Sequence, residues 1–199
     1  MLVVRSAKTK KPVVLTIGHS THTWNDFRDL LRAHRVKRVV DLRSIPRSRH
    51  NPQFNRETLQ IKLRAAEIGY VHLRRLGGLR HARRDSRNMG WRNTSFRGFA
   101  DYMQTSEFEA GLQRLMKLAG QKQSAIMCAE AVSWRCHRSL VANALTVHGI
   151  RVDDIMSMKR SQVHSLTPFL RVQGHRVTYP IGDRGDGRIK RKSGSNVVR

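Results

Sequence analysis

Short apolar runs rich in β-branched residues alternate with segments of helical periodicity along most of this chain. The run Val13–Ile17 is followed at once by Gly18, which is typical of a buried strand that ends in a turn. Four similar runs predict further strands, at 36–42, 71–73, 124–128 and 152–155. Strands that alternate with helices form a mostly parallel sheet covered by helices on both faces. The alternation therefore predicts a single three-layer α/β domain.

The segments between these runs carry apolar residues three or four positions apart, as amphipathic helices do. Four helices are expected: from Thr23 onward, over Arg56–Glu67, from Ser106 onward, and over His137–His148. Ser106 and Glu109 have the spacing of a capping box, and Gly120 is expected to end the helix that they begin. Residues 169–172 and 176–179 flank a glycine-containing turn, which predicts a small C-terminal hairpin.

The boundaries of the domain follow from where the apolar pattern begins and ends. A chain of 199 residues suits one domain, which we place at 13–180. We expect flexible basic termini at 1–12 and 181–199, the latter a disordered basic tail with few core-forming residues. Between Arg74 and Arg97 no periodicity emerges, and so long a loop is expected to be functional or disordered.

The composition is strongly basic. Lys and Arg number 39 against 14 Asp and Glu, a formal net charge of +25, which favours a nucleic acid or another phosphate-bearing partner. Only 2 cysteines are present, so a disulfide framework is not expected. No apolar run is long enough for a membrane span, and the N-terminus has no secretory pattern. We therefore expect a cytoplasmic protein with no membrane partner, and leave its oligomeric state open.

Polar and charged residues follow three of the predicted strands. In a parallel sheet the carboxyl ends of the strands share one edge, where ligands bind, so these residues are expected to converge. After the first strand come His19 and Ser20. After the second and fourth come two further groups: Asp41, Arg43, Ser44 and Arg49, then Glu130, Cys136, His137 and Arg138. Together they predict one anion-binding site.

Cys136, His137 and Arg138 stand where a helix is predicted to begin. A helix N-terminus attracts anions through its unpaired N–H groups and its dipole, and Arg138 can grip two phosphate oxygens. The same surroundings would stabilise a Cys136 thiolate as a nucleophile. A third interpretation is an inert, packed cysteine. His137, like His19, Ser20, Arg43, Ser44 and Arg49, is assigned to ligand binding.

Asp41 and Glu130 are carboxylates that follow apolar strands. With Cys136 they are the candidate catalytic residues, each carboxylate acting as a general base. Alternatively, Asp41 orients Arg43 or Arg49, and Glu130 orients Arg138. A metal site would draw on His19, Asp41, Glu130, Cys136 and His137. No pair among them has the close sequence spacing of known zinc motifs. We therefore expect neither a metal nor a cofactor.

Several motifs occur in one order along the chain. They are Thr16-Ile-Gly-His-Ser20, Asp41-Leu-Arg-Ser44, Leu76-Gly-Gly-Leu-Arg80, Phe96-Arg-Gly-Phe-Ala-Asp-Tyr-Met103, Cys128-Ala-Glu130, Cys136-His-Arg138, Leu166-Thr-Pro-Phe169 and Val177-Thr-Tyr-Pro180. Together they resemble a known family, called domain of unknown function 488 (DUF488). The resemblance covers roughly Val13 to Pro180 and implies a bacterial-type, single-domain α/β protein, without implying an activity.

Two functions of different classes fit these features. In the first, the chain binds or processes a phosphate-bearing ligand, a nucleotide or nucleic acid, at the carboxyl ends of the parallel strands. In the second, it is a non-catalytic nucleic-acid-binding module that uses its net charge, the segment Arg74–Arg97 and the basic tail 181–199. That segment interleaves arginines with Trp91 and Phe96, a composition that suits single-stranded nucleic acid or a lid over a small ligand.

Overall fold

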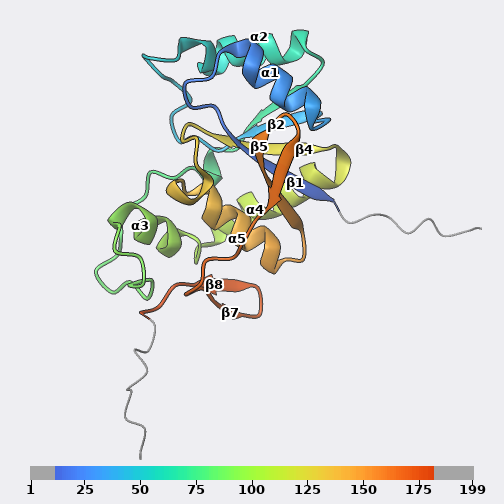
Figure 1. The fold of residues 1–199 in the computed structure, drawn as a ribbon. Helices are drawn as coiled ribbons and strands as arrows, with labels where there is room; N and C mark the ends of the chain where they lie inside the picture. Colours follow the sequence, from blue (N-terminus) through green and yellow to red (C-terminus); the bar gives the residue numbers. More distant parts are fainter. Residues whose placement is uncertain (1–11, 182–199) are drawn as a thin grey trace, which may run out of the picture.

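A six-stranded sheet forms the centre of the structure, a computed structural model that describes residues 12–181 (Figure 1). Its order is β3-β2-β4-β1-β5-β6. The strands are β1 (Val13–Gly18), β2 (Arg38–Asp41), β3 (Gly69–His72), β4 (Ser124–Cys128), β5 (Arg151–Ser157) and β6 (Arg160–Val163). Every pairing from β3 to β5 is parallel, and only β6 is antiparallel to its neighbour. The predicted, mostly parallel sheet is confirmed.

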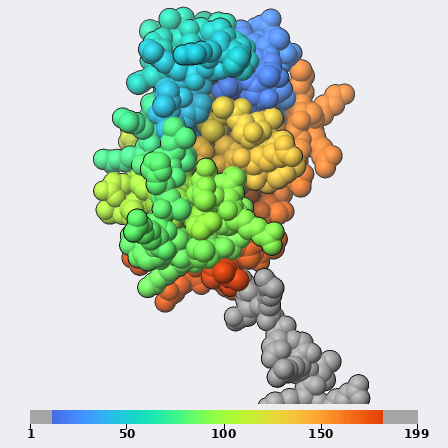
Figure 2. All heavy atoms as spheres, turned by 90° about the vertical axis from the view of Figure 1, so that its left-hand side faces the viewer, coloured from blue at the N-terminus to red at the C-terminus, as the bar shows by residue number. Residues whose placement is uncertain are grey.

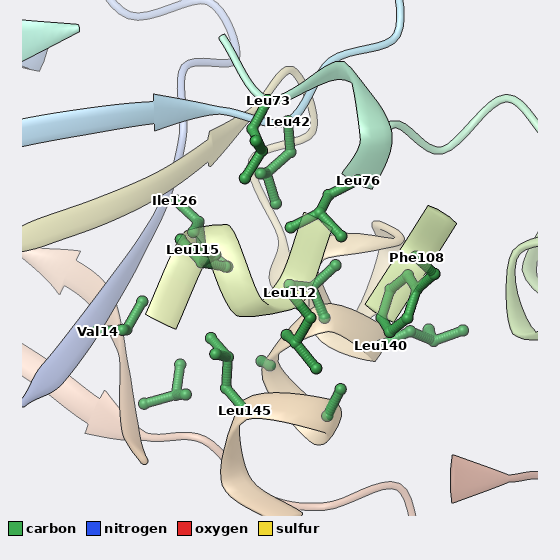
Figure 3. Packing of buried hydrophobic residues seen from close by; sticks show 14 of the residues in the cluster. Val14, Leu42, Leu73, Leu76, Phe108, Leu112, Leu115, Ile126, Leu140 and Leu145 are labelled. Atoms are coloured by element: carbon green, nitrogen blue, oxygen red, sulfur yellow. The ribbon is translucent and has the colours of Figure 1, made fainter. Parts of the chain in front are cut away.

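Helices cover both faces of this sheet (Figure 1). The helices are α1 (Trp24–Ala33), α2 (Arg56–Ala65), α3 (Thr94–Tyr102), α4 (Ser106–Gln121) and α5 (Arg138–Val147). Successive strand residues point to opposite faces, so Val14 packs with the core beneath α4 and α5, whereas Leu15 packs with the core beneath α1 and α2. Figure 3 shows the first core, to which α4 contributes Leu112 and Leu115.

The helix ends lie within two residues of those expected: α2 ends at Ala65 and not at Glu67, and α5 spans Arg138–Val147 and not His137–His148. Thr23 caps α1 as expected, because its Oγ1 accepts a hydrogen bond from the Asp26 N–H at 3.2 Å. The predicted capping box is wrong by one position: Thr105, not Ser106, caps α4 and accepts from the Phe108 N–H at 3.3 Å. Gly120 does not end that helix, which continues to Gln121.

Two elements were not expected from the sequence. Strand β6 is polar and fully exposed, as an edge strand with a charged residue can be, so it lacks the apolar signal of the others. Helix α3 begins at the end of the irregular stretch Arg74–Arg97, and its nine residues span too few turns to show a clear period. The expected C-terminal hairpin is confirmed as β7 (Arg171–Gln173) and β8 (Arg176–Thr178).

One buried carboxylate, that of Asp101, anchors the long segment between the short 3₁₀ helix η2 (Arg74–Leu76) and α3. Asp101 accepts hydrogen bonds from the Arg83 N–H, the Ser86 hydroxyl and the Asn88 amide at 2.6–2.9 Å. Asn88 in turn accepts from the Tyr179 N–H at 2.9 Å, which ties the segment to the C-terminal hairpin. The expectation of disorder here is therefore wrong.

The expected flexible termini lie almost entirely outside the described residues. Across residues 12–181, none of the helices combines the length and the apolar character that a membrane crossing requires.

Candidate functional site

A cleft of about 640 Å³ opens at the carboxyl ends of β1, β2 and β4; we call it the carboxyl-edge cleft. Figure 2 shows the face on which its walls meet: the loop after β2 in cyan, the segment before α3 in green and the loop after β4 in yellow. Most of the predicted site residues line it, namely His19, Ser20, Arg43, Ser44, Glu130, Cys136 and His137. Asp41, Arg49 and Arg138 do not.

The loops after β1 and β4 are held together by backbone contacts. The His19 N–H donates to the Cys128 carbonyl at 3.0 Å, and the Ser20 N–H donates to the Ala129 carbonyl at 2.8 Å. A Cβ on Gly18 would collide with the backbone of Glu130 and Ala131, so only glycine allows this approach. Ser20 itself has a φ of 43°, a left-handed conformation that is uncommon for a residue other than glycine and often marks a functional position.

Asp41 and Arg43 form a buried ion pair beneath the cleft. The Arg43 guanidinium donates to both Asp41 carboxylate oxygens, at 2.9 and 2.6 Å, and also to the Phe54 carbonyl at 2.8 Å. Tyr70 donates its hydroxyl hydrogen to the same carboxylate at 2.8 Å. Of the two interpretations of Asp41, the geometry shows the one in which it orients Arg43. The carboxylate has no opening to the cleft through which to act as a base.

His19 is neutral in this setting. It is 2% exposed, stacks on the Phe54 ring at 4.4 Å, and its Nε2 lies 3.2 Å from the Arg43 guanidinium, which can only donate. Nδ1 then carries the proton and donates to the Ser20 carbonyl at 3.0 Å. Burial, together with the charge of Arg43, lowers the pKa of His19 from 6.5 to about 4. His19 therefore presents no positive charge to a ligand near neutral pH.

Arg138 does not grip a ligand in the carboxyl-edge cleft. Its buried guanidinium donates to the backbone carbonyls of Glu130 and Ala131 and, at 3.4 Å, to the Thr16 hydroxyl. The expectation that the Glu130 carboxylate orients Arg138 is wrong, because the contact is made by the Glu130 carbonyl. Arg138 instead stabilises the conformation of the loop after β4 through these two carbonyls, and it does not line the cleft.

The Glu130 carboxylate and Arg49 are both exposed. Glu130 lies on the cleft wall and accepts a hydrogen bond from the Val132 N–H at 3.4 Å. Arg49 lies in the loop after β2 but does not line the cleft. The cleft receives two other guanidinium side chains instead, those of Arg47 and Arg135. Sequence reasoning did not assign either as a site residue, because each is one of many arginines in irregular segments.

Three potential metal ligands lie together in the cleft: Cys128, Cys136 and His137, the thiol–imidazole cluster. Their ligand atoms are within 4.8 Å of one another, and His137 Nδ1 lies 3.9 Å from Cys128 Sγ and 3.7 Å from Cys136 Sγ. Sequence reasoning named Cys136 and His137 as metal candidates with His19, Asp41 and Glu130, and missed Cys128. The signal was present, since Cys128 ends a strand at the same sheet edge.

The two thiols differ in acidity. Hydrogen bonding from Cys128, aided by the charge and N–H of Arg138, lowers the pKa of Cys136 from 9.0 to about 7. The partner thiol moves the other way: the hydrogen bond to Cys136 and burial raise the pKa of Cys128. Cys136 is therefore the sulfur of the cluster that ionises first, and it can act as a nucleophile or a ligand.

Comparisons with known proteins agree with this architecture only at the level of the family. Neither the curated proteins nor the solved structures gave a match to the chain. The family model described as "Domain of unknown function DUF488" matches residues 23–145, more than half of the 199 residues. The matched region contains most of the cleft, including the loops after β2 and β4. The chain belongs to the DUF488 family.

Proposed function

We propose that the carboxyl-edge cleft binds a nucleotide, or a nucleotide unit of a nucleic acid, with its phosphate beside Arg47 and Arg135. The observation that carries this proposal is that one cleft combines these two cationic side chains with an exposed apolar surface. Clefts of this kind, at the carboxyl edge of an open parallel sheet, are where ligands bind in α/β proteins. A volume of about 640 Å³ lies within the range of small-molecule sites.

The charges of the cleft favour an anion. Within residues 12–181, neither Arg47 nor Arg135 forms an ion pair, whereas Arg43 is already neutralised by Asp41. The carboxylate of Glu130 is the one acidic group among the described lining residues, so the cationic side chains outnumber it. A guanidinium offers a planar fork of donors that matches two phosphate oxygens.

The apolar surface of the cleft favours a ligand that is more than a phosphate. Ile45 is 63% exposed and Leu79 is 71% exposed, and both line the cleft with the half-buried ring of Phe96. Apolar side chains that gather in one cleft form a surface that a ligand can cover. A nucleobase would cover part of this surface while its phosphate contacts the arginines. Inorganic phosphate alone would leave the apolar side chains in water.

Thermal unfolding of the full chain with adenosine diphosphate, adenosine and inorganic phosphate tests the proposal. A ligand at about 100 times its Kd adds about 2.7 kcal/mol, or a Tm rise of about 5–11 °C for a domain of this size. We expect that rise with adenosine diphosphate and a smaller one with either fragment. Arg47→Gln and Arg135→Gln should each reduce it. Arg114→Gln, on the exposed side of α4, is the matched control and should retain it.

An equal response in all three variants, or none in the parent chain to any nucleotide, contradicts the proposal.

A second candidate, non-catalytic binding of nucleic acid, is favoured by exposed arginines of the segment Arg74–Arg97. These are Arg74, Arg75, Arg84, Arg87 and Arg92. Affinity that comes mainly from such side chains falls steeply with salt and shows little sequence preference. Fluorescence anisotropy with a single-stranded oligonucleotide at several salt concentrations separates the candidates. A nucleotide site predicts that adenosine diphosphate competes with the oligonucleotide, whereas a purely electrostatic surface predicts no competition.

A further inference from the structure

We propose that Cys128, Cys136 and His137 form a binding site for Zn²⁺ or a similar thiophilic divalent cation, with a fourth position open to the carboxyl-edge cleft. The proposal goes beyond nucleotide binding and does not depend on it, since it rests on the arrangement of three ligand atoms. Two thiolates and one imidazole are a donor set that zinc accepts in proteins.

The distances within the thiol–imidazole cluster match those of a tetrahedral zinc site. With Zn–S about 2.3 Å and Zn–N about 2.05 Å, a tetrahedron places each sulfur about 3.6 Å from the nitrogen. The observed separations from His137 Nδ1 are 3.7 Å to Cys136 Sγ and 3.9 Å to Cys128 Sγ. Both sulfur–nitrogen separations are therefore within a few tenths of an ångström of the required spacing. The two sulfur atoms lie within 4.8 Å of each other, where a tetrahedron places them about 3.8 Å apart, so a small movement of the thiols completes the site.

The hydrogen bond on the far side of His137 prepares its ring for coordination. Nε2 lies 3.1 Å from the Leu76 carbonyl oxygen, which can only accept, so Nε2 carries the proton. In the neutral ring, Nδ1 then has a free lone pair, and it faces both sulfurs. Metal-binding histidines usually donate the N–H of their second ring nitrogen to a carbonyl or carboxylate oxygen in this way.

Packing holds the ring in that orientation. Phe99 contacts the His137 ring edge-to-face at a centroid distance of 5.0 Å. Gly78 also lies so close that a Cβ there would collide with the imidazole at Nδ1. Both sulfur atoms belong to buried residues, so the cluster excludes most solvent while it still borders the cleft. The low exposure of the two cysteines limits the access of water to an ion bound between them.

Three protein ligands leave one tetrahedral position for a solvent molecule or a ligand oxygen. Such an open position distinguishes catalytic zinc sites from structural ones, which are closed by four protein ligands. Binding breaks two S–H bonds, and the two protons pass to solvent, so the ion and its two thiolates together are neutral. A phosphate oxygen in the cleft could then reach the metal from the open side.

Cobalt titration of the full chain provides the test, without any nucleotide. The protein is reduced with a phosphine, stripped with a chelator and titrated with Co²⁺, whose spectrum reports thiolate coordination and tetrahedral geometry. We expect one equivalent of Co²⁺ to bind with a thiolate-to-cobalt charge-transfer band, and Zn²⁺ to displace it. Cys128→Ser, Cys136→Ser and His137→Gln should each weaken binding by at least about tenfold.

The matched control is His81→Gln, because His81 is an exposed histidine outside the cluster. It should bind Co²⁺ as the parent chain does. The proposal is overturned if the reduced parent chain, folded by circular dichroism, gives no charge-transfer band. Equal binding by Cys136→Ser and the parent chain also overturns it. Because the parent chain alone can decide the result, misfolding of a cysteine variant does not leave the question open.

Discussion

Replacing Asp41 with asparagine should destabilise the protein severely. Asp41 is 0% exposed and Arg43 is 5% exposed, so the substitution removes the charge that compensates a buried guanidinium. The carboxylate also accepts the Arg43 backbone N–H at 3.0 Å and the Tyr70 hydroxyl at 2.8 Å. An asparagine amide offers one oxygen where the carboxylate offers two. Its NH₂ group would also face a hydrogen-bond donor, because Arg43 and Tyr70 donate to the two carboxylate oxygens that it would partly replace.

The size of the effect follows from the burial of the pair. Breaking a buried ion pair by removing one partner costs about 3–5 kcal/mol, most of it from the charge left uncompensated. For a domain of this length each kcal/mol lowers the Tm by about 2–4 °C, so Asp41→Asn should lower it by about 6–20 °C. The double variant Asp41→Asn/Arg43→Met removes both charges. It should recover part of that loss, because no buried charge is then left uncompensated.

Urea unfolding followed by far-ultraviolet circular dichroism measures these differences in the free energy of unfolding. The matched control is Asp85→Asn, which breaks the exposed pair with Arg83 and should leave stability unchanged. A loss below about 1 kcal/mol in Asp41→Asn, or a double variant less stable than the single one, would refute the assignment of Asp41 as a structural clamp. Asp41 would then again be a candidate catalytic base.

Three other outcomes are expected. Gly18→Ala should destabilise the chain by about 1–3 kcal/mol in urea, because its Cβ meets backbone atoms, whereas Gly120→Ala, which meets open space, should not destabilise it. The folded pKa of His19, about 4, lies below its unfolded value of 6.5. The unfolded chain therefore binds more protons between these values, and stability should fall as pH drops from about 6.5 to 4, less steeply in His19→Gln. Asp101→Ala should speed limited proteolysis between Leu79 and Arg92, since it removes three hydrogen bonds from that segment.

The parallel sheet could be predicted because its strands are nearly continuous apolar runs between turn residues. The structure confirms Ser124–Cys128 as a strand with the expected bounds, since it is buried on both faces. Strand β6 could not be found in this way, because an exposed edge needs no apolar face. Helix α3 could not be found from the sequence either, because it is short and has a glycine, a poor helix former, at its centre. A Cβ at that position, Gly98, would collide with the Arg80 carbonyl.

The position of the site could be predicted, but not the direction of its long side chains. The rule that ligands bind at the carboxyl edge correctly brought Ser20, Ser44 and Cys136 to one cleft. An arginine side chain is long and can extend in several directions from its backbone. The sequence therefore could not show that the Arg138 guanidinium binds the carbonyls of the loop after β4 and not a ligand in the cleft. The pairing of Cys128 with His137 depends on how the loop after β4 returns to the sheet, which no local pattern encodes.

The most direct test of a nucleotide site in the carboxyl-edge cleft is an NMR titration of the ¹⁵N-labelled chain with adenosine diphosphate. A nucleotide bound in this cleft should cause saturable shifts in the amides of Ser20 and Ser44 and in the side-chain Nε signals of Arg47 and Arg135, with the Arg114 signal unchanged. Shifts confined to other faces of the molecule, or shifts that grow without saturation and disappear with moderate salt, would contradict it.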